Sequence, residues 1–160
     1  MADPGSLSCT TPSNETTATL PLTLNNITGL INDTTISDST SGYDFTEKSE
    51  QTATSSTTDT RVVSSTSGRC DIYFKNDTSI SKKILYSING IKDLGEKDSL
   101  NTIGSVSTTG YSTNAEVTAN HCYAIKTAEG YYTKLRVENV SDSSLYFKWS
   151  LQPVSGNSQF

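Results

Sequence analysis

The stretch HCYAIKTAEGYYTKLRV, residues 121–137, decides the fold because apolar and polar residues alternate on both sides of a short turn. HCYAIKT is an extended run, and AlaGluGly at 128–130 forms a turn in which Gly130 can adopt a positive φ. In the run that follows, one face carries Tyr131, Thr133, Leu135 and Val137, and the other carries Tyr132, Lys134 and Arg136. The stretch therefore predicts two antiparallel strands.

The residues that follow predict a third strand. SerAspSerSer at 141–144 is a turn, and LYFKWSL after it places Leu145, Phe147, Trp149 and Leu151 on one face. A three-stranded meander with such an apolar face has to bury it, and a second sheet is the usual way. We therefore expect an all-β protein, an antiparallel β-sandwich or jelly-roll, in which Trp149 is buried with Phe147.

The preceding residues read in the same way. GRCDIYFKN alternates Cys70, Ile72 and Phe74 against polar neighbours, and KKILYSI is followed by Asn89-Gly90, a strong hairpin-turn signal. Residues 93–117 predict loops and brief strands. No segment longer than about ten residues has a helical apolar period, so little helix is expected.

Composition divides the chain at residue 69. Residues 1–69 contain 29 Ser or Thr and two aromatic residues, whereas residues 70–160 contain 21 Ser or Thr and eleven aromatic residues. We therefore expect a Ser/Thr-rich N-terminal arm followed by a β-sandwich domain at 70–160. Within the arm, VVSST at 62–66 is a candidate short strand.

A second candidate strand in the arm lies near residues 19–27. Leu20, Leu22 and Leu24 alternate with Pro21 and Thr23, the period of a strand with one buried face. Pro21 lacks a backbone donor, so this segment should lie at an edge or pair on one side only. We expect it to add a strand to an exposed sheet edge, either of its own domain or of a neighbouring subunit.

The charge distribution excludes one large class of partners. The arm has a net charge of −5, and residues 70–160 have nine acidic and nine basic side chains. Without a basic patch, nucleic-acid binding lacks its main attractive term. No apolar run has the length of about 18–20 residues that a membrane span requires. The opening MADPGS resembles an added leader, with a natural cytoplasmic start as the alternative.

The three cysteines form no CxxC motif. Cys70 and Cys122 both open strand-like runs, so we expect a disulfide between them; two buried free thiols are the alternative. Cys9 then remains in the arm, where an intermolecular bond, a lipid attachment or a reactive thiol would account for it.

Candidate catalytic residues are few. His121 is the only histidine, and in a strand its neighbour Cys122 points to the opposite face, so the two cannot form a dyad. No hydrolase, zinc-protease, P-loop or dinucleotide motif occurs, and no cofactor is implied. The loop DSTSGYD at 38–44 offers Asp38 and Asp44 to calcium without EF-hand spacing, and a solvated loop is the simpler reading. We therefore expect a non-enzymatic protein without a metal.

Two further sets of residues are candidate surface sites. Tyr73, Tyr132 and Tyr146 fall on the outward face of the predicted strands and are a candidate aromatic platform for sugar or protein. Five Asn-x-Ser/Thr sequons favour export with glycosylation, although about three are expected by chance at this composition; they lie at Asn14, Asn26, Asn32, Asn76 and Asn139.

Several segments resemble a known group of proteins. CDIYF, DLG, GYST, HCYAIKTAEGYYTKLRV and FKWSLQPVSGNSQF, in this order, are similar to the C-terminal domain of uncharacterised secreted or surface-attached bacterial and archaeal proteins. The similarity covers about residues 42–160 and is most specific in KTAEGYYTKLRV. It implies a β-rich extracellular module and no particular activity.

These observations lead to one preferred function and two rivals. We expect an extracellular or cell-surface structural or interaction protein, with itself or another surface component as partner and filament formation by strand addition as one form. A carbohydrate-binding module that uses the exposed tyrosines is the first rival, and an enzyme of unknown type is the second.

Overall fold

The computed structural model describes residues 30–38, 41–52 and 70–160, and its all-β antiparallel architecture confirms the predicted fold class. The strands of the described residues are β1 (Asn32–Ser37), β2 (Ser41–Asp44), β3 (Ser49–Thr52), β4 (Ile72–Asp77), β5 (Lys82–Glu96), β6 (Ser112–Glu116), β7 (His121–Lys126), β8 (Tyr132–Val140) and β9 (Ser144–Leu151). The only helical element among them is a 3₁₀ turn, η1 (Leu100–Thr102).

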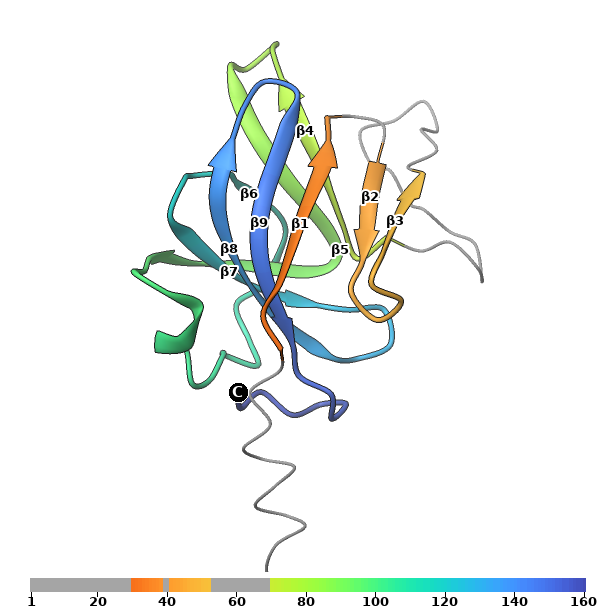
Figure 1. Ribbon diagram of the computed structural model, residues 1–160, viewed down its shortest axis with the longest axis vertical. Helices are drawn as coiled ribbons and strands as arrows, with labels where there is room; N and C mark the ends of the chain where they lie inside the picture. Colours follow the sequence, from red (N-terminus) through yellow and green to blue (C-terminus); the bar gives the residue numbers. More distant parts are fainter. Residues whose placement is uncertain (1–29, 39–40, 53–69) are drawn as a thin grey trace, which may run out of the picture.

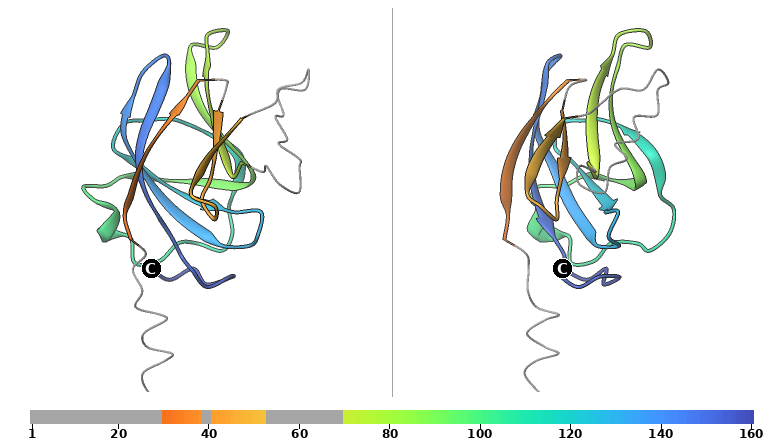
Figure 2. Two further views of the ribbon diagram at one scale, coloured as in Figure 1. Left: turned by 45° about the vertical axis from the view of Figure 1, so that its right-hand side comes forward. Right: turned by 90° about the vertical axis from the view of Figure 1, so that its right-hand side faces the viewer.

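One continuous sheet takes the place of two separate layers. Its strand order is β1-β9-β8-β7-β5-β4-β2-β3, with β6 paired to β5, and the sheet curves until it is nearly a barrel (Figures 1 and 2). At the seam, β1 lies beside β2 but pairs with β9 instead. Asp38 ties the seam at one end: its N–H donates to the carbonyl of Ser143 (2.8 Å), and its Oδ1 accepts from the N–H of Asn76 (2.7 Å).

The predicted meander is confirmed as β7, β8 and β9. Tyr123 pairs with Leu135, and Leu135 with Trp149, so all three strands point the same set of side chains into the barrel. Phe147 and Trp149 are fully buried, as the alternation in LYFKWSL predicts. The indole N–H of Trp149 donates to Oγ1 of Thr34 on β1 (3.0 Å), which satisfies a polar group that burial would otherwise penalise.

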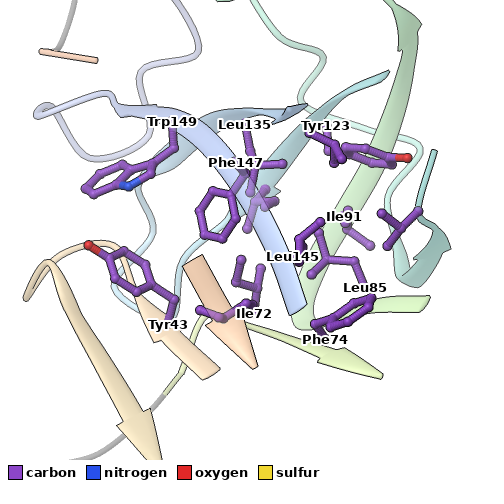
Figure 3. Close-up of a cluster of buried hydrophobic side chains, with 14 of the residues drawn as sticks. Tyr43, Ile72, Phe74, Leu85, Ile91, Tyr123, Leu135, Leu145, Phe147 and Trp149 are labelled. Atoms are coloured by element: carbon purple, nitrogen blue, oxygen red, sulfur yellow. The ribbon is translucent and has the colours of Figure 1, made fainter. Parts of the chain in front are cut away.

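The barrel interior holds the main core (Figure 3). Buried side chains of β1, β2, β4, β5, β7, β8 and β9 contribute to it. Its densest part is aromatic. The ring of Trp149 meets Phe45 and Tyr43 edge-on, with centroids 5.0 and 5.5 Å apart, the geometry that aromatic quadrupoles favour. Because Tyr43 and Phe45 come from β2 and the turn after it, this contact spans the seam of the barrel.

A second, smaller core covers the outer surface of β7 and β8. Cys122, Ala124 and Tyr132 face outward from the barrel and are buried beneath Leu100 and other apolar residues of the long loop between β5 and β6. Lys134 lies on this same outward face with 2% of its surface exposed, and its Nζ donates to the carbonyl of Ile103 (2.9 Å). The prediction of two faces for β8 is therefore correct, but both faces are covered.

The hairpin predicted at Asn89-Gly90 is wrong. The chain continues as one long strand, β5, whose first part pairs with β4 and whose last part pairs with β7. Gly90 has φ of +129°, and the β5–β6 register shifts between Tyr86 and Ile91. The positive φ that a turn would need instead bends the strand at a corner of the barrel.

The predicted boundary at residue 69 also differs from the folded domain. Residues 32–52 supply β1, β2 and β3, and Ile36, Tyr43 and Phe45 are buried in the core. Composition hides this contribution because short strands surrounded by Ser and Thr bury only three large side chains. Residues 19–27 and 62–66, with Leu20, Leu22 and Leu24, lie outside the described residues, as do Cys9, Asn14 and Asn26.

Trp149→Ala should destabilise the protein by about 3–5 kcal/mol, because it removes the largest side chain of the core and leaves a cavity beside Tyr43 and Phe45. Urea denaturation monitored by circular dichroism measures the loss. Lys148→Ala, one residue away on the outer face, is the matched control and should change stability by less than about 0.5 kcal/mol. A loss below about 1 kcal/mol for Trp149→Ala contradicts the described core.

Gly42→Ala should cost about 1–3 kcal/mol, because a Cβ at this position in β2 would lie 2.2 Å from Sγ of Cys70 and 2.7 Å from the carbonyl oxygen of Ile72. The same denaturation experiment tests it. Gly104→Ala is the control, since no atom lies within 4 Å of a Cβ built there. Equal stabilities of the two variants would show that β2 does not pack against the segment before β4.

Candidate binding face

The outer face of β1, β9 and β8 carries charged and hydrogen-bonding side chains and has a recess beside it. Alternation sends Trp149 and Phe147 inward, so Lys148 and Tyr146 of β9 project outward. Asp33 of β1 lies opposite Lys148, and its Oδ1 accepts a hydrogen bond from the hydroxyl of Tyr146 (3.1 Å). This hydrogen bond raises the pKa of Tyr146. We call this surface the β1–β9–β8 face.

Arg136 on β8 anchors the face to the neighbouring loops. Its Nη1 lies 2.6 Å from Oε1 of Glu138, its Nη2 donates to Oδ1 of Asn120 (3.0 Å), and its Nε donates to the carbonyl of Lys97 (2.8 Å). Because the guanidinium is rigid and planar, these three partners hold it in one orientation. Its bond to the carbonyl of Lys97 holds the loop after β5 against the sheet. Arg136 therefore shapes the face and has little bonding capacity left for a ligand.

A recess of about 280 Å³ lies where this loop meets the sheet. Its lining combines apolar, acidic, basic and amide side chains: Ile31, Asp98, Ser99, Leu100, Asn101, Arg136, Glu138 and Lys148. Two cations and two anions balance one another in this lining. Within the described residues, Lys148 and Asp98 take part in no ion pair or hydrogen bond through their side chains.

This arrangement is suited to recognition. An ammonium, a carboxylate and the Asn101 amide offer both donors and acceptors to a ligand, while Leu100 and Ile31 add apolar walls. No Ser, Cys or Thr in the lining is hydrogen-bonded to a histidine or a carboxylate that would activate it as a nucleophile, among the interactions that the described residues make. The alternation in the sequence predicts that Lys148 points outward. No pattern in the sequence predicts that residues 98–101 lie next to it.

A second recess of about 350 Å³ is lined by other residues of the same loop and by the end of β5. Its lining is Leu94, Lys97, Thr102, Ile103, Gly104 and Ser105. Lys134 lies behind it, held by the carbonyl of Ile103, and burial lowers the pKa of its ammonium group. The ammonium also lies 4.8 Å from the ring centroid of Phe160. Lys134 thus secures the loop and the C-terminal segment over the second core.

The aromatic platform of three tyrosines is not formed. Tyr73 and Tyr132 are 6% and 8% exposed, so both are buried. Tyr73 stacks on Tyr86 across the β4–β5 pair, with centroids 4.7 Å apart, and Tyr132 belongs to the second core. Only Tyr146 remains partly exposed. The three tyrosines point outward, as the alternation predicts, but loops and neighbouring side chains cover the outer faces of β4 and β8.

The predicted Cys70–Cys122 disulfide is absent, and both residues are free thiols. Cys122 faces outward on β7 into the second core, whereas Cys70 lies beside Gly42 on β2, in a different part of the sheet. Burial raises the pKa of each thiol to about 11. Both cysteines are therefore poor nucleophiles at neutral pH, in line with a packing role.

His121 is paired with a carboxylate. Its Nδ1 lies 3.1 Å from both oxygens of Asp93, whose Oδ1 also accepts from the N–H of Gly95 (2.7 Å). Cys122 points to the other face of β7, as expected for adjacent strand residues. His121 and Asp93 are both partly exposed, and no serine, threonine or cysteine hydroxyl or thiol is bonded to His121 in the described residues.

The suggested calcium ligands serve other purposes. Asp38 holds Asn76 at the seam, and Oδ1 of Asp44 accepts from the N–H of Glu47 (2.9 Å) in the turn after β2. Residues 39 and 40 between them lie outside the described residues. In the described ranges, no three His, Cys, Asp or Glu residues are arranged to hold a metal ion.

Three sequons fall within described residues, and they differ in exposure. Asn139 is exposed near the end of β8 and lies opposite Tyr146 in the register, whereas Asn76 and Asn32 are half-buried. The side-chain amide of Asn32 donates to the carbonyl of Leu30 (2.8 Å). Asn139 is thus the most accessible of these three acceptors for a glycan.

Cys70 and Cys122 should both remain unmodified when the native protein is treated with iodoacetamide at pH 7.5, because the thiolate form is scarce and Cys122 is buried. Both should react fully after denaturation without any reductant. Peptide mass spectrometry measures the modification at each site, with Cys9 as the internal comparison. Detection of two peptides linked by a Cys70–Cys122 disulfide would contradict this prediction.

The described part of the chain contains no helix of the length and hydrophobicity needed to cross a membrane. The sequence matches no model of a known protein family and is similar to no curated protein.

Proposed function

We propose that the protein is a non-enzymatic extracellular structural or interaction protein that assembles with copies of itself by strand addition. The observation that supports this proposal is an edge strand in the described part of the sheet. Within the described residues, β3 pairs with β2 and is the last strand in the order of the sheet, which makes it an edge strand of that part of the chain. Edge strands are where another chain adds a strand to a sheet.

The donor in this proposal is the segment near residues 19–27. Leu20, Leu22 and Leu24 have the alternation that an added strand needs, and Pro21 limits the segment to pairing on one side. A strand passed from one copy to the next is a head-to-tail contact, which propagates into a filament unless it closes into a ring. Cys9 precedes this segment in the sequence, and a disulfide between the Cys9 residues of two copies would lock their junction.

The extracellular location rests on composition and on the resemblance to secreted and surface-attached proteins. A Ser/Thr-rich segment before a β-rich domain is typical of surface proteins, and Asn139 offers an exposed sequon. The half-buried Cys70 and the buried Cys122 support a non-enzymatic role, because the raised pKa of each thiol suppresses the thiolate that nucleophilic chemistry would need.

Deleting residues 1–29 should convert assembled protein into monomers that keep the melting temperature of the domain, because the donor strand is lost and the described sheet is intact. Light scattering after size exclusion, together with electron microscopy, measures assembly. Leu22→Asp should weaken assembly at least tenfold by placing a charge in the donated strand. Ser13→Asp adds the same charge outside residues 19–27 and should leave assembly unchanged. Full-length protein that stays monomeric at high concentration contradicts the proposal.

A carbohydrate-binding module is the second candidate, and the recess on the β1–β9–β8 face favours it. Its volume of about 280 Å³ lies at the lower end of small-molecule sites, and its mixed donors and acceptors suit hydroxyl groups. In this version Lys148, Asp98 and Asn101 replace the tyrosines. Titration with a panel of monosaccharides, followed by amide chemical shifts, should then move signals of these residues, and Lys148→Ala should abolish the shifts.

A further inference from the structure

The recess of about 350 Å³ that Gly104 helps to line takes no part in the proposed function, and we call it the Gly104 recess. Among the described residues, Lys97 is the only charged side chain in its lining, and Leu94 and Ile103 supply apolar walls. The recess on the β1–β9–β8 face differs, because two cations and two anions balance each other there. The Gly104 recess therefore has the size of a small-molecule site and one positive charge that no acidic side chain of its lining balances.

The ammonium group of Lys97 is free, although its backbone is fixed. The N–H of Lys97 donates to the carbonyl of Asn120 (3.2 Å), and its carbonyl accepts from Nε of Arg136 (2.8 Å). In the described part of the chain, the Lys97 side chain takes part in no ion pair or hydrogen bond. Its sequence neighbours Glu96 and Asp98 are acidic, but neither lines the Gly104 recess. Lys97 is thus held at this recess with its charge available to a ligand.

A buried lysine lies behind the Gly104 recess. Lys134 is 2% exposed, and its Nζ donates to the carbonyl of Ile103 (2.9 Å). No carboxylate pairs with it among the described residues. The peptide bond between Ile103 and Gly104 is trans, so its N–H points in the direction opposite to its C=O. The N–H of Gly104 therefore points away from Lys134, and the hydrogen bond from Lys134 to the carbonyl makes this N–H a stronger donor.

The N–H of Gly104 is also available to a ligand. Within the described ranges, neither this N–H nor that of Ser105 donates a hydrogen bond. The carbonyl of Gly104 accepts from the N–H of Phe160 (2.8 Å), which fixes the backbone here. Gly104 is exposed, and a Cβ built on it meets no atom within 4 Å, so the space in front of it is open. Fixed backbone N–H groups of this kind are good donors to an anion.

We propose that the Gly104 recess binds a small molecule that carries one carboxylate on an apolar body. The carboxylate accepts hydrogen bonds from the Lys97 ammonium and the N–H of Gly104, and the body packs against Leu94 and Ile103. The apolar walls favour such a molecule over an inorganic anion, because a bare anion leaves them in contact with water. This site depends neither on strand addition nor on the recess of the β1–β9–β8 face.

Titration of the full chain with sodium hexanoate, followed by amide chemical shifts, tests the site. The amide proton of Gly104 should move downfield and saturate with a dissociation constant of about 1 mM or below. Hexan-1-ol has the same chain without the charge, and acetate has the charge without the chain, so each should bind at least about tenfold more weakly. Absence of a saturable shift overturns the proposal. Hexan-1-ol or acetate that binds as tightly as hexanoate overturns it as well.

Two lysine variants locate the charge that holds the carboxylate. Lys97→Gln should weaken hexanoate binding at least about tenfold, because it removes a charge-assisted hydrogen bond. The melting temperature should not change, since the Lys97 side chain makes no hydrogen bond or ion pair in the described part of the protein. Lys148→Gln removes an equally free ammonium from the other recess and should leave the affinity unchanged. Unchanged affinity of Lys97→Gln, or an equal loss in both variants, overturns the proposal.

Discussion

The contact of Trp149 with Tyr43 and Phe45 is the interaction on which the barrel depends. Strand pairing alone leaves the sheet open between β1 and β2, because no ladder of hydrogen bonds joins these strands. The aromatic rings close the interior across this seam instead. Each buried aromatic side chain removes about 150–250 Å² from water, which is worth roughly 4–6 kcal/mol as an upper estimate. Polar contacts such as those of Asp38 then fix the position of the seam.

This way of closing the barrel has a consequence for its dynamics. The β2–β3 hairpin supplies Tyr43 and Phe45 to the contact with Trp149. It is joined to β4 by only a short pairing. Side chains add to this attachment, among them the rings of Tyr43 and Phe45 and the carboxyl of Asp71. An element with so short a backbone pairing can open locally at a lower free energy than the central strands, whose backbone pairing is longer. In the described part of the chain, the sheet is therefore least firmly paired at the β2–β3 hairpin.

The outer surface is governed by a different constraint. The loop after β5 and the C-terminal segment cover β7 and β8. Lys134 and Arg136 hold the loop through the backbone carbonyls of Ile103 and Lys97, and Lys134 also contacts the ring of Phe160. Long cationic side chains suit this role because their aliphatic stems pack on the sheet while their ends reach the loop. Arg136 lines the recess on the β1–β9–β8 face and bonds the loop after β5 to the sheet, and Lys148 lines the same recess without an ion pair in the described residues. Fold and candidate site therefore share the same loop.

The amino-acid sequence by itself determined the strand character and the direction of the side chains. Alternation in LYFKWSL and YYTKLRV was sufficient to predict β8 and β9 and the burial of Trp149, because a period of two leaves one choice of inward face. Only the tertiary structure decided how far the sheet curves, where Asn89-Gly90 lies in it, and which outward faces are covered. These depend on contacts between residues far apart in the chain: Gly42 with Cys70, Asp71 with Ala128, and Tyr132 with Leu100. Local periodicity does not contain such distances, so the disulfide and the tyrosine platform were predicted wrongly while the strands were predicted correctly.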